Sequence, residues 1–333
     1  MKVWNVLLFL LPRPSLSSRQ KRYFKFVRRK MDDEQTLNRI ARVRNRTLDD
    51  CAKVFEKNAW DDIEWTEEKR QAAESRVLLN SSNPLSEEEA GEYVTNAGKH
   101  WNNFYEKHSD QFFKKRQWLD SEFPEIMDEE ARLLLSPQSE ELSVVFETGC
   151  GTGSTVIPLL RDTKRTFVHC CDFSENAIKL LKSSPEYDTS RCNAFVADLT
   201  DEHSEWPVPP ESVDFIIIVY TLSAISPDKM VFVIQRLVRA LKPGGRLFFR
   251  DYGKYDLAQL RFKPAQCAGE NLYVRQDGTL AYFFTQEEVR NLFCSAGLKE
   301  EQNAVDRRLL VNRKKKLLMH RVWIQCKYSK PEN

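Results

Sequence analysis

From about residue 136 onward, the chain alternates short apolar runs with segments of helical spacing. The apolar runs are rich in β-branched and aromatic residues and predict four strands, over residues 144–148, 166–172, 192–198 and 213–222. Residues 215–219 are continuously apolar, which is typical of a strand covered on both faces. Because helical segments separate these runs, the pattern indicates a doubly wound α/β fold with a mostly parallel sheet.

Helix signals lie between the strands, and more strands follow. Ser174 is a suitable N-cap for one helix, and residues 230–241 predict another that ends at a Lys-Pro-Gly-Gly sequence. A fifth strand is expected over 246–250. Two last apolar runs, 308–312 and 322–327, are expected to pair antiparallel, so the sheet would have seven strands.

The N-terminal part has a different pattern, and the chain divides into three segments. Residues 32–135 are polar, charged and aromatic with helical spacing, and residues 136–333 hold the alternating strands and helices. Residues 1–30 contain nine Lys or Arg and no acid, so we treat 1–31 as a basic leader. Three explanations of this leader stay open: a secretory signal, an organellar transit peptide, or a functional start at Met31.

Composition excludes several classes of protein. With 41% hydrophobic and 30% charged residues, the 333-residue chain can bury a core and is not disordered. No apolar run approaches the roughly 18 residues that span a bilayer. The net charge is only +2, so nucleic-acid binding has to come from local basic patches. The eight cysteines form no Cys-x-x-Cys pair, so we expect free thiols, no metal site and a reducing, cytoplasmic location.

A glycine-rich turn directly after the first strand is the most informative motif. Gly149, Gly151 and Gly153 stand at alternate positions, and such turns let a ligand approach the backbone closely. Phosphate-binding and nicotinamide-binding folds use similar loops, and a plain tight turn is a further alternative. No Gly-Lys-Ser/Thr follows, and Glu147 would repel a pyrophosphate but suits an ammonium or sulfonium group.

Two acidic residues at the ends of the next strands extend this site. Asp172 ends the second strand, where such folds bind a ribose diol. Asp198 ends the third strand and precedes Leu199, a pair that suits the amino group and the face of an adenine. An adenosine site beside an acid that favours a sulfonium indicates S-adenosylmethionine as the cofactor.

Several longer motifs resemble a known family, the methyltransferase-like enzymes that form 3-methylcytidine at position 32 of tRNA anticodon loops. The likeness runs from about residue 51 to 331 and is strongest to the branch that acts on threonine and arginine tRNAs. Four stretches carry it: Lys-Val-Phe-Glu-Lys-Asn-Ala-Trp-Asp at 53–61, His-Trp-Asn-Asn-Phe-Tyr at 100–105, Phe-Phe-Arg-Asp-Tyr-Gly-Lys-Tyr-Asp at 248–256, and Asn-Leu-Tyr-Val-Arg-Gln-Asp-Gly-Thr at 271–279.

This resemblance implies a Rossmann-like class I S-adenosylmethionine-dependent methyltransferase domain at 136–333, after a helical RNA-binding and cofactor-lid region at 32–135. The family's cofactor contacts fall on Trp101, Tyr105, Gly149, Asp172, Asp198, Leu199 and Val219. Trp101 and Tyr105 are four residues apart, so on a helix they share one face, which either covers a cofactor or packs the helix onto the sheet.

Two departures from the family pattern stand outside these contacts. The family's Asp-Arg-His run is Lys115-Arg116-Gln117 here, and its Arg after Asp-Gly-Thr is Leu280. Both changes alter the local charge. We expect neither to touch the cofactor site.

The implied reaction needs no strong general base. Cytosine N3 has an in-plane lone pair and can attack the sulfonium methyl directly, so catalysis would rest on alignment and electrostatics. A carboxylate would stabilise the positive charge that develops on the base. Asp251 is the first candidate, with Arg250 and Tyr252 beside it, and Asp277 is the second. A salt bridge to Arg250 or a loop cap is the structural alternative for Asp251.

The target base must leave the loop stack, so aromatic and cationic contacts to RNA are expected. The candidate stacking groups are Tyr252, Tyr255 and Tyr282. The candidate RNA-binding residues outside the last strand pair are Arg116, within the aromatic and basic run 112–118, and Arg261, Lys263, Arg275 and Asp277. The basic segment 307–316, with Arg307, Arg308, Arg313 and Lys314, predicts a hairpin that follows an RNA backbone. A solvated surface is the alternative for each cation.

Two other functions stay open from the residues alone. The cofactor motif also fits a methyltransferase for a protein or a small molecule, and the fold also serves non-catalytic binding subunits. The intact glycines and acids argue against the second alternative. The expected partners are the tRNA anticodon loop and, as in some family members, an auxiliary tRNA-binding protein or synthetase, with no membrane. The basic leader makes a mitochondrial location the alternative to the cytoplasm.

Overall fold

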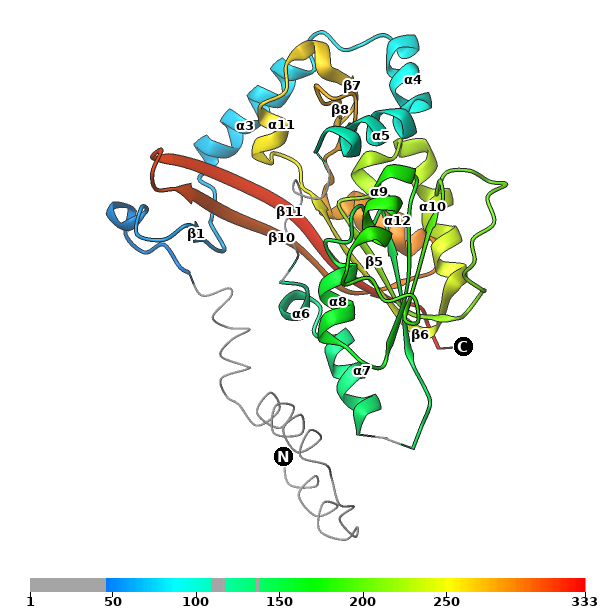
Figure 1. Ribbon diagram of the computed structural model, residues 1–333. Helices are drawn as coiled ribbons and strands as arrows, with labels where there is room; N and C mark the ends of the chain where they lie inside the picture. Colours follow the sequence, from blue (N-terminus) through cyan, green and yellow to red (C-terminus); the bar gives the residue numbers. More distant parts are fainter. Residues whose placement is uncertain (1–45, 109–115, 117, 136–137, 333) are drawn as a thin grey trace. The chain divides into compact units, whose positions relative to one another are not determined.

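The computed structural model describes residues 46–108, 116, 118–135 and 138–332, and the chain from Arg46 onward forms one compact unit (Figure 1). The basic leader at 1–31 and the aromatic and basic residues at 112–115 lie outside the described residues. None of the described helices has the length and apolar character that a bilayer-spanning segment needs.

Five parallel strands form the centre of the main sheet. They are β2 (Ser143–Thr148), β3 (Thr166–Asp172), β4 (Cys192–Val196), β5 (Val213–Val219) and β6 (Leu241–Tyr252). β2 pairs with both β3 and β5, while β3 pairs with β4 and β5 with β6. The strand order therefore reverses at β2, the position where such sheets bind ligands beyond the carboxyl ends of their strands.

Three antiparallel strands complete this sheet. β11 (Leu317–Ser329) pairs with β6, β10 (Lys299–Asn312) with β11, and β1 (Ala59–Trp60) with β10. The prediction of a mostly parallel sheet with a terminal antiparallel pair is confirmed. The prediction of seven strands is wrong, because the main sheet has eight in the order β1-β10-β11-β6-β5-β2-β3-β4. Two residues are too few to show a strand period, so only the pairing with β10 defines β1.

Helices bury both faces of the parallel strands. Ile216 and Ile218 of β5 belong to one core, and Ile217 belongs to the core on the other face. This alternation is the reason that the run 215–219 is continuously apolar. The first core is covered by α10 (Pro227–Ala240) and α12 (Gln286–Ser295), and the second by α7 (Glu125–Leu134), α8 (Val156–Asp162) and α9 (Glu175–Ser183).

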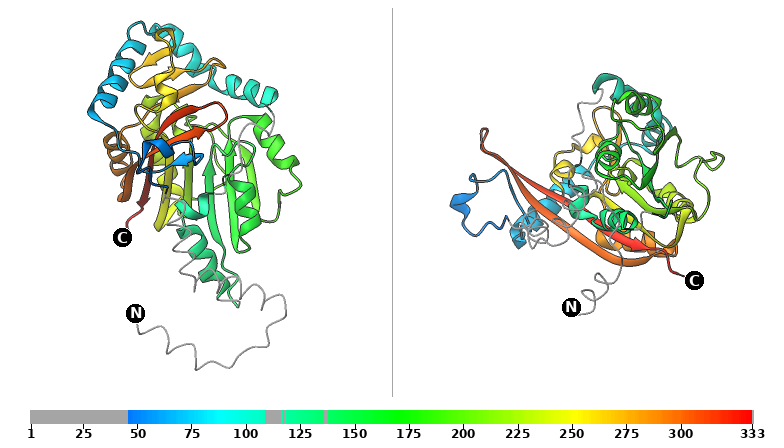
Figure 2. Two further views of the ribbon diagram at one scale, coloured as in Figure 1. Left: turned by 90° about the vertical axis from the view of Figure 1, so that its left-hand side faces the viewer. Right: turned by 60° about the horizontal axis from the view of Figure 1, so that its bottom comes forward.

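Short elements gather above the carboxyl ends of the parallel strands, at one end of the compact unit (Figures 1 and 2). The helices there are α3 (Glu67–Asn80), α4 (Glu87–Thr95), α5 (Ala97–His108) and α11 (Leu257–Leu260). A second, unpredicted sheet consists of β7 (Cys267–Gly269), β8 (Leu272–Val274) and β9 (Leu280–Tyr282). The remaining helical elements are η2 (Cys51–Lys53), α6 (Leu119–Glu122), η3 (Leu222–Ala224) and η4 (Pro264–Gln266).

The β10–β11 hairpin projects from the sheet, as Figures 1 and 2 show. Both strands are much longer than the predicted runs at 308–312 and 322–327. A small apolar cluster of Trp60, Leu309 and Val311 holds β1 against this hairpin. The predicted basic hairpin between the last two strands therefore exists, and the segment before α3 packs on it.

Candidate functional site

A cavity of about 510 Å³ lies at the carboxyl ends of β2, β3 and β5. Its volume is within the range of about 300–1,000 Å³ that small-molecule sites occupy. The glycine turn forms its floor, and the junction of α4 and α5 forms a wall with Thr95, Asn96 and Ala97. The cavity therefore lies where the reversal of strand order places a ligand site.

Two glycines of the turn make room for a ligand. Gly149 has a φ of +60°, and a Cβ there would lie 2.3 Å from Thr221 Oγ1. Gly151 has a φ of +53°, and a Cβ there would lie 2.6 Å from the Tyr105 hydroxyl oxygen. Both positions combine a left-handed backbone with a close approach, so the sequence has no alternative to glycine there.

Asp172 holds the turn in place. Its Oδ2 accepts from Gly151 N–H at 2.9 Å and its Oδ1 accepts from Ser174 N–H at 2.9 Å. Burial raises the pKa of Asp172 to about 6, and the two backbone N–H groups oppose that shift. The carboxylate lines the cavity and still has free lone pairs, so the predicted contact with a diol stays a prediction.

The aromatic pair on α5 also faces the cavity. Trp101 and Tyr105 both line it, and their ring centroids lie 6.0 Å apart. Tyr105 is buried and packs on Phe104 and Ala177 of the α5–α9 interface. Helix α5 therefore has both of the roles predicted as alternatives, because the same face covers the cavity and packs on α9.

Glu147 and Arg116 form a buried ion pair next to the cavity. Arg116 Nη1 lies 3.1 Å from Glu147 Oε1 and donates to Thr155 Oγ1 at 2.7 Å. Burial raises the pKa of Glu147 to about 7, and its Oε2 has no hydrogen-bond partner among the described residues. Arg116 lines the cavity with a side chain only 12% exposed. Arg116 therefore lies at the cavity, and its predicted contact with RNA stays a prediction.

The adenine candidates lie at the rim of the cavity. Asp198 is exposed, and its Oδ1 accepts from the backbone N–H and the hydroxyl of Thr200 at 2.8 and 2.7 Å. Leu199 is buried beside it, and both residues line the cavity. The structure thus brings together the acid and the apolar residue that were predicted to bind an adenine.

Three predicted cofactor residues lie behind the wall rather than in it. Glu147 contacts the cavity only through Arg116, and a Cβ on Gly153 would meet Leu181 Cδ1 at 2.5 Å inside the core. Val219 is buried, and its carbonyl accepts from Arg116 Nη2 at 3.4 Å. These residues shape the site from outside the cavity.

Two further expectations about the cavity need correction. Arg116, in the departing run, and Leu280, which replaces the family's Arg, both line it, so the departures do touch the cofactor site. The sequence analysis also missed wall residues that carry no motif of their own, mainly Phe173, Thr200, Tyr220, Thr221 and Lys229.

Tyr220 is the most informative of the missed residues. It follows β5 directly, lines the cavity and has a φ of +57°, which a residue with a side chain rarely adopts. Its ring lies 5.2 Å from that of Tyr252, and the Arg116 guanidinium lies 5.7 Å from its centroid. Strained residues of this kind concentrate at functional sites. The position after a buried parallel strand was the only signal for it in the sequence.

The three predicted catalytic residues do not line the cavity. Asp251 is fully buried and accepts from Ser223 N–H at 2.9 Å and from Tyr252 N–H at 2.8 Å. It therefore holds η3 beside the cavity, as in the loop-cap alternative, and its catalytic role stays a prediction. Burial raises its pKa to about 6. Tyr252 contacts the cavity only through Tyr220, and burial raises its pKa.

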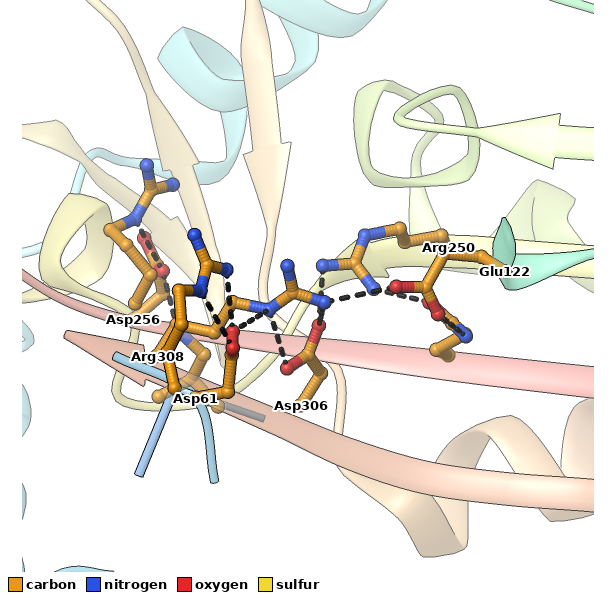
Figure 3. A network of polar contacts seen from close by, with 10 residues as sticks. Asp61, Glu122, Arg250, Asp256, Asp306 and Arg308 are labelled. Carbon is orange, nitrogen blue, oxygen red and sulfur yellow. Dashed lines mark hydrogen bonds and ion pairs between the residues drawn. The ribbon is translucent and has the colours of Figure 1, made fainter. Parts of the chain in front are cut away.

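Arg250 belongs to a buried network of charges (Figure 3). Its Nη2 lies 2.7 Å from Asp306 Oδ2, and it also donates to Gln325. Arg308 joins the same network through Asp306 at 2.8 Å, Glu122 at 3.1 Å and Asp61 at 3.6 Å (Figure 3). Both guanidinium groups are paired with carboxylates away from the cavity, and the catalytic role of Arg250 and the RNA-binding role of Arg308 stay predictions.

The other predicted RNA contacts differ in exposure. Arg275 donates to Leu280 O at 2.7 Å, and Asp277 Oδ1 accepts from Thr279 N–H at 3.0 Å, so these two side chains stabilise the turn before β9. Tyr282 is buried with its hydroxyl on Glu288, which makes its predicted stacking role wrong. The cations that stay exposed are Arg261, Lys263, Arg307, Arg313 and Lys314.

Comparison with known proteins places this cavity in context. Residues 146–247 match the model of a methyltransferase domain family. The chain is 48% identical over 311 residues to the tRNA N(3)-cytidine methyltransferase METTL2 of Danio rerio, covering 86% of this chain and 88% of that protein. It is 45% identical over 351 residues to METTL2B of Homo sapiens, covering 86% and 93%. It is 40% identical over 287 residues to the tRNA N(3)-methylcytidine methyltransferase trm140 of Schizosaccharomyces pombe, covering 86% and 91%.

Proposed function

This chain belongs to the METTL2 family of tRNA N(3)-cytidine methyltransferases, and from that premise we propose how its cavity selects and positions one cytidine of the anticodon loop. It is an S-adenosylmethionine-dependent enzyme that forms 3-methylcytidine in tRNA. Position 32 is the proposed target, and threonine tRNA is the proposed substrate, with arginine tRNA second. The single observation that supports this reading best is a ligand-sized cavity floored by two obligatory glycines and rimmed by Asp172 and Asp198.

The residues of the cavity fit the cofactor. Asp172 suits the ribose diol, and Asp198 with Leu199 suits the adenine. Arg116, held by Glu147, presents a guanidinium edge of the kind that pairs with a carboxylate, such as that of the methionine part. A Cβ at Gly149 or Gly151 would meet the side chains that close the turn, so these glycines are required for the cradle.

The bound cofactor supplies a methyl group on a sulfonium centre, which a neutral ring nitrogen with an in-plane lone pair accepts without help from a base. The chain then has to orient the cytosine and exclude water. We propose that Tyr220 is the surface that orients it, because its strained backbone places the ring in the cavity wall beside Arg116. Asp251 is a positioning residue in this scheme, because its hydrogen bonds fix the turn that begins after Tyr220.

The tRNA backbone is proposed to follow the exposed cations of two regions. One is the tip of the β10–β11 hairpin with Arg313 and Lys314, and the other is the segment after α11 with Arg261 and Lys263. The N-terminal region at 32–135 and the domain at 136–333 would then share RNA binding, since the described residues 46–63 pack on the hairpin.

Protein partners and compartment stay predictions. An auxiliary tRNA-binding protein or synthetase is the proposed partner, as in other family members. All eight cysteines are free and six of them are buried, and a reducing compartment such as the cytoplasm is the proposed location.

Position mapping tests the proposed target. The protein is incubated with labelled S-adenosylmethionine and threonine tRNA, and 3-methylcytidine is located by reverse-transcription stops, because N3 methylation blocks base pairing. A stop at position 32 that disappears when C32 is replaced by U supports the proposal. Methylation of another cytidine contradicts it, and label in protein alone supports the alternative of a protein methyltransferase.

A further inference from the structure

A group of aromatic and cationic side chains lies outside the cavity, at the start of α3. The ring of Trp65 lies 6.4 Å from that of Tyr255 and 6.2 Å from that of His320. Lys69 Nζ lies 5.2 Å from the Trp65 ring, and Lys254 Nζ lies 5.6 Å from the Tyr255 ring. These five residues, called the Trp65 cluster below, come from three separate parts of the chain.

The two large rings are not explained by the packing of the core. Trp65 and Tyr255 are only partly buried, and neither belongs to any of the apolar clusters among the described residues. Tyr255 also has a φ of +69°, an uncommon backbone conformation for a tyrosine. Two partly exposed rings that the core does not require are suited to contact with a ligand that has a flat apolar face.

The surroundings hold this cluster rigidly. Tyr255 N–H donates to Gln259 Oε1 at 2.6 Å, and the buried Asp256 accepts from Arg321 at 2.8 Å. Helix α3 is fixed to the same region, because Asn80 Nδ2 donates to Gln259 O at 3.0 Å. A ring held in this way loses little entropy when it binds a partner, so the Tyr255 side of the cluster is preorganised.

The charge of the cluster favours an anion. Lys69 has no carboxylate partner within the described part of the chain, and its Nζ contacts the His320 ring. Partial burial lowers the pKa of Lys69 to about 8, so its ammonium lacks a group that stabilises it. Glu67, an acid of the same helical turn, is already engaged by Arg70 and Gln71. A phosphate would supply the missing negative charge.

The position of the cluster relates it to the site of methylation. Tyr255 follows the carboxyl end of β6, the neighbour of β5, and three residues earlier Tyr252 contacts the cavity residue Tyr220. The cluster and the cavity therefore lie along the same edge of the sheet. A chain of nucleotides that enters the cavity at one point can reach the cluster at another.

We propose that Trp65 and Tyr255, together with Lys69 and Lys254, bind an unpaired nucleotide of the anticodon loop that neighbours the methylated cytidine. Its base stacks on the rings, and its phosphate lies near the two lysines. Base stacking on aromatic side chains is a common way to hold single-stranded RNA without reading its sequence. This inference depends on one part of the proposed function, namely that the substrate is tRNA.

Paired substitutions test the stacking. Trp65→Ala and Tyr255→Ala are each expected to raise the KM for tRNA about tenfold, which is typical of the loss of one stacked base. Trp65→Phe and Tyr255→Phe keep a ring and are expected to stay within about threefold of the unaltered protein. Affinity for S-adenosylmethionine, measured by calorimetry, is expected not to change in any of the four. A loss of cofactor affinity would show structural damage and overturn the assignment.

Photocrosslinking supplies an independent measurement that does not depend on the stability of a variant. The unaltered protein is irradiated with threonine tRNA that carries 5-iodouridine at single positions of the anticodon loop. A crosslinked peptide that contains Trp65 or Tyr255 supports the proposal, and crosslinks confined to other peptides overturn it. If the unaltered protein methylates tRNA but the alanine variants keep its KM, only this inference fails. If no tRNA is methylated, the proposed function itself fails.

Discussion

The two edges of the main sheet use charged residues in different ways. At the carboxyl ends of the parallel strands, Asp172 and Arg116 line a cavity. Asp172 accepts from two backbone N–H groups, and Arg116 pairs with a single acid, Glu147. At the antiparallel edge, Arg307 and Arg308 are neighbours in β10 but have opposite surroundings. Arg307 is exposed, whereas the side chain of Arg308 is only 15% exposed and pairs with three carboxylates. Alternate residues of a strand face opposite sides, so a basic run divides its charges between solvent and core.

Removing Arg308 from the buried charge network is expected to have the largest effect, and this effect is on the stability of the protein. Arg308→Ala leaves Glu122 without its cation, while Asp61 keeps Arg46 and Asp306 keeps Arg250. The variant is expected to lower the free energy of unfolding by about 2 kcal/mol. Arg307→Ala is the matched control and is expected to change it by less than about 0.5 kcal/mol. Urea denaturation measures both. Equal effects would show that the two arginines do not differ in the way described.

A substitution in the glycine turn at the carboxyl ends of the parallel strands is expected to have the next largest effect, here on cofactor affinity. In Gly149→Ala the new Cβ would clash with Thr221 and strain a left-handed backbone, so cofactor affinity is expected to fall at least about 100-fold. Gly91→Ala is the matched control, because its Cβ would meet nothing within 4 Å. Calorimetry with S-adenosylmethionine measures both variants. Normal cofactor affinity in Gly149→Ala would remove the main argument for the site.

The Glu147–Arg116 pair predicts a pH dependence of cofactor binding. The pKa of Glu147 is raised to about 7 by burial, so the carboxyl gains a proton as the pH falls through that value and no longer orients Arg116 as a charged partner. Affinity is expected to fall below about pH 7, by up to about tenfold per pH unit. Glu147→Gln is expected to bind the cofactor weakly at pH 8 and to flatten this profile. A slope that persists in the variant would assign the titration to another group, such as Asp172.

The exposed hairpin cations give the smallest effect. Lys314→Ala is expected to weaken tRNA binding a few-fold and to reduce the slope of log affinity against log salt by about 1. The control is Arg161→Ala, an exposed charge on α8 that pairs with Asp162. Binding at several salt concentrations measures both slopes. An unchanged slope in Lys314→Ala would place the RNA backbone elsewhere.

The parallel half of the fold was predictable because its signals are local. The strand over 166–172 has the predicted bounds, and Ser174 caps α9 by accepting from Ala177 N–H at 3.2 Å. The candidate cofactor residues were predictable for the same reason, since Gly149 follows β2 directly, Asp172 ends β3 and Asp198 lies two residues after β4.

The terminal antiparallel pair was predicted, but its full strand bounds, strand β1 and the roles of the arginines were not predictable in this way. β1 exists only through its pairing with β10, about 250 residues later in the chain. Arg116, Arg250 and Arg308 look like surface cations in the sequence. Their partners Glu147, Asp306 and Glu122 are defined by contacts between elements that are distant along the chain.

Sequence by itself predicted the glycine turn and the acids of the candidate methyl-donor site, because backbone turns at the ends of strands depend on residues next to one another. It also determined the family, because the long polar motifs are specific. Only the tertiary structure decided which charged side chains face a ligand and which face each other. Burial and charge pairing depend on which distant segments meet, and no local pattern in the chain encodes that.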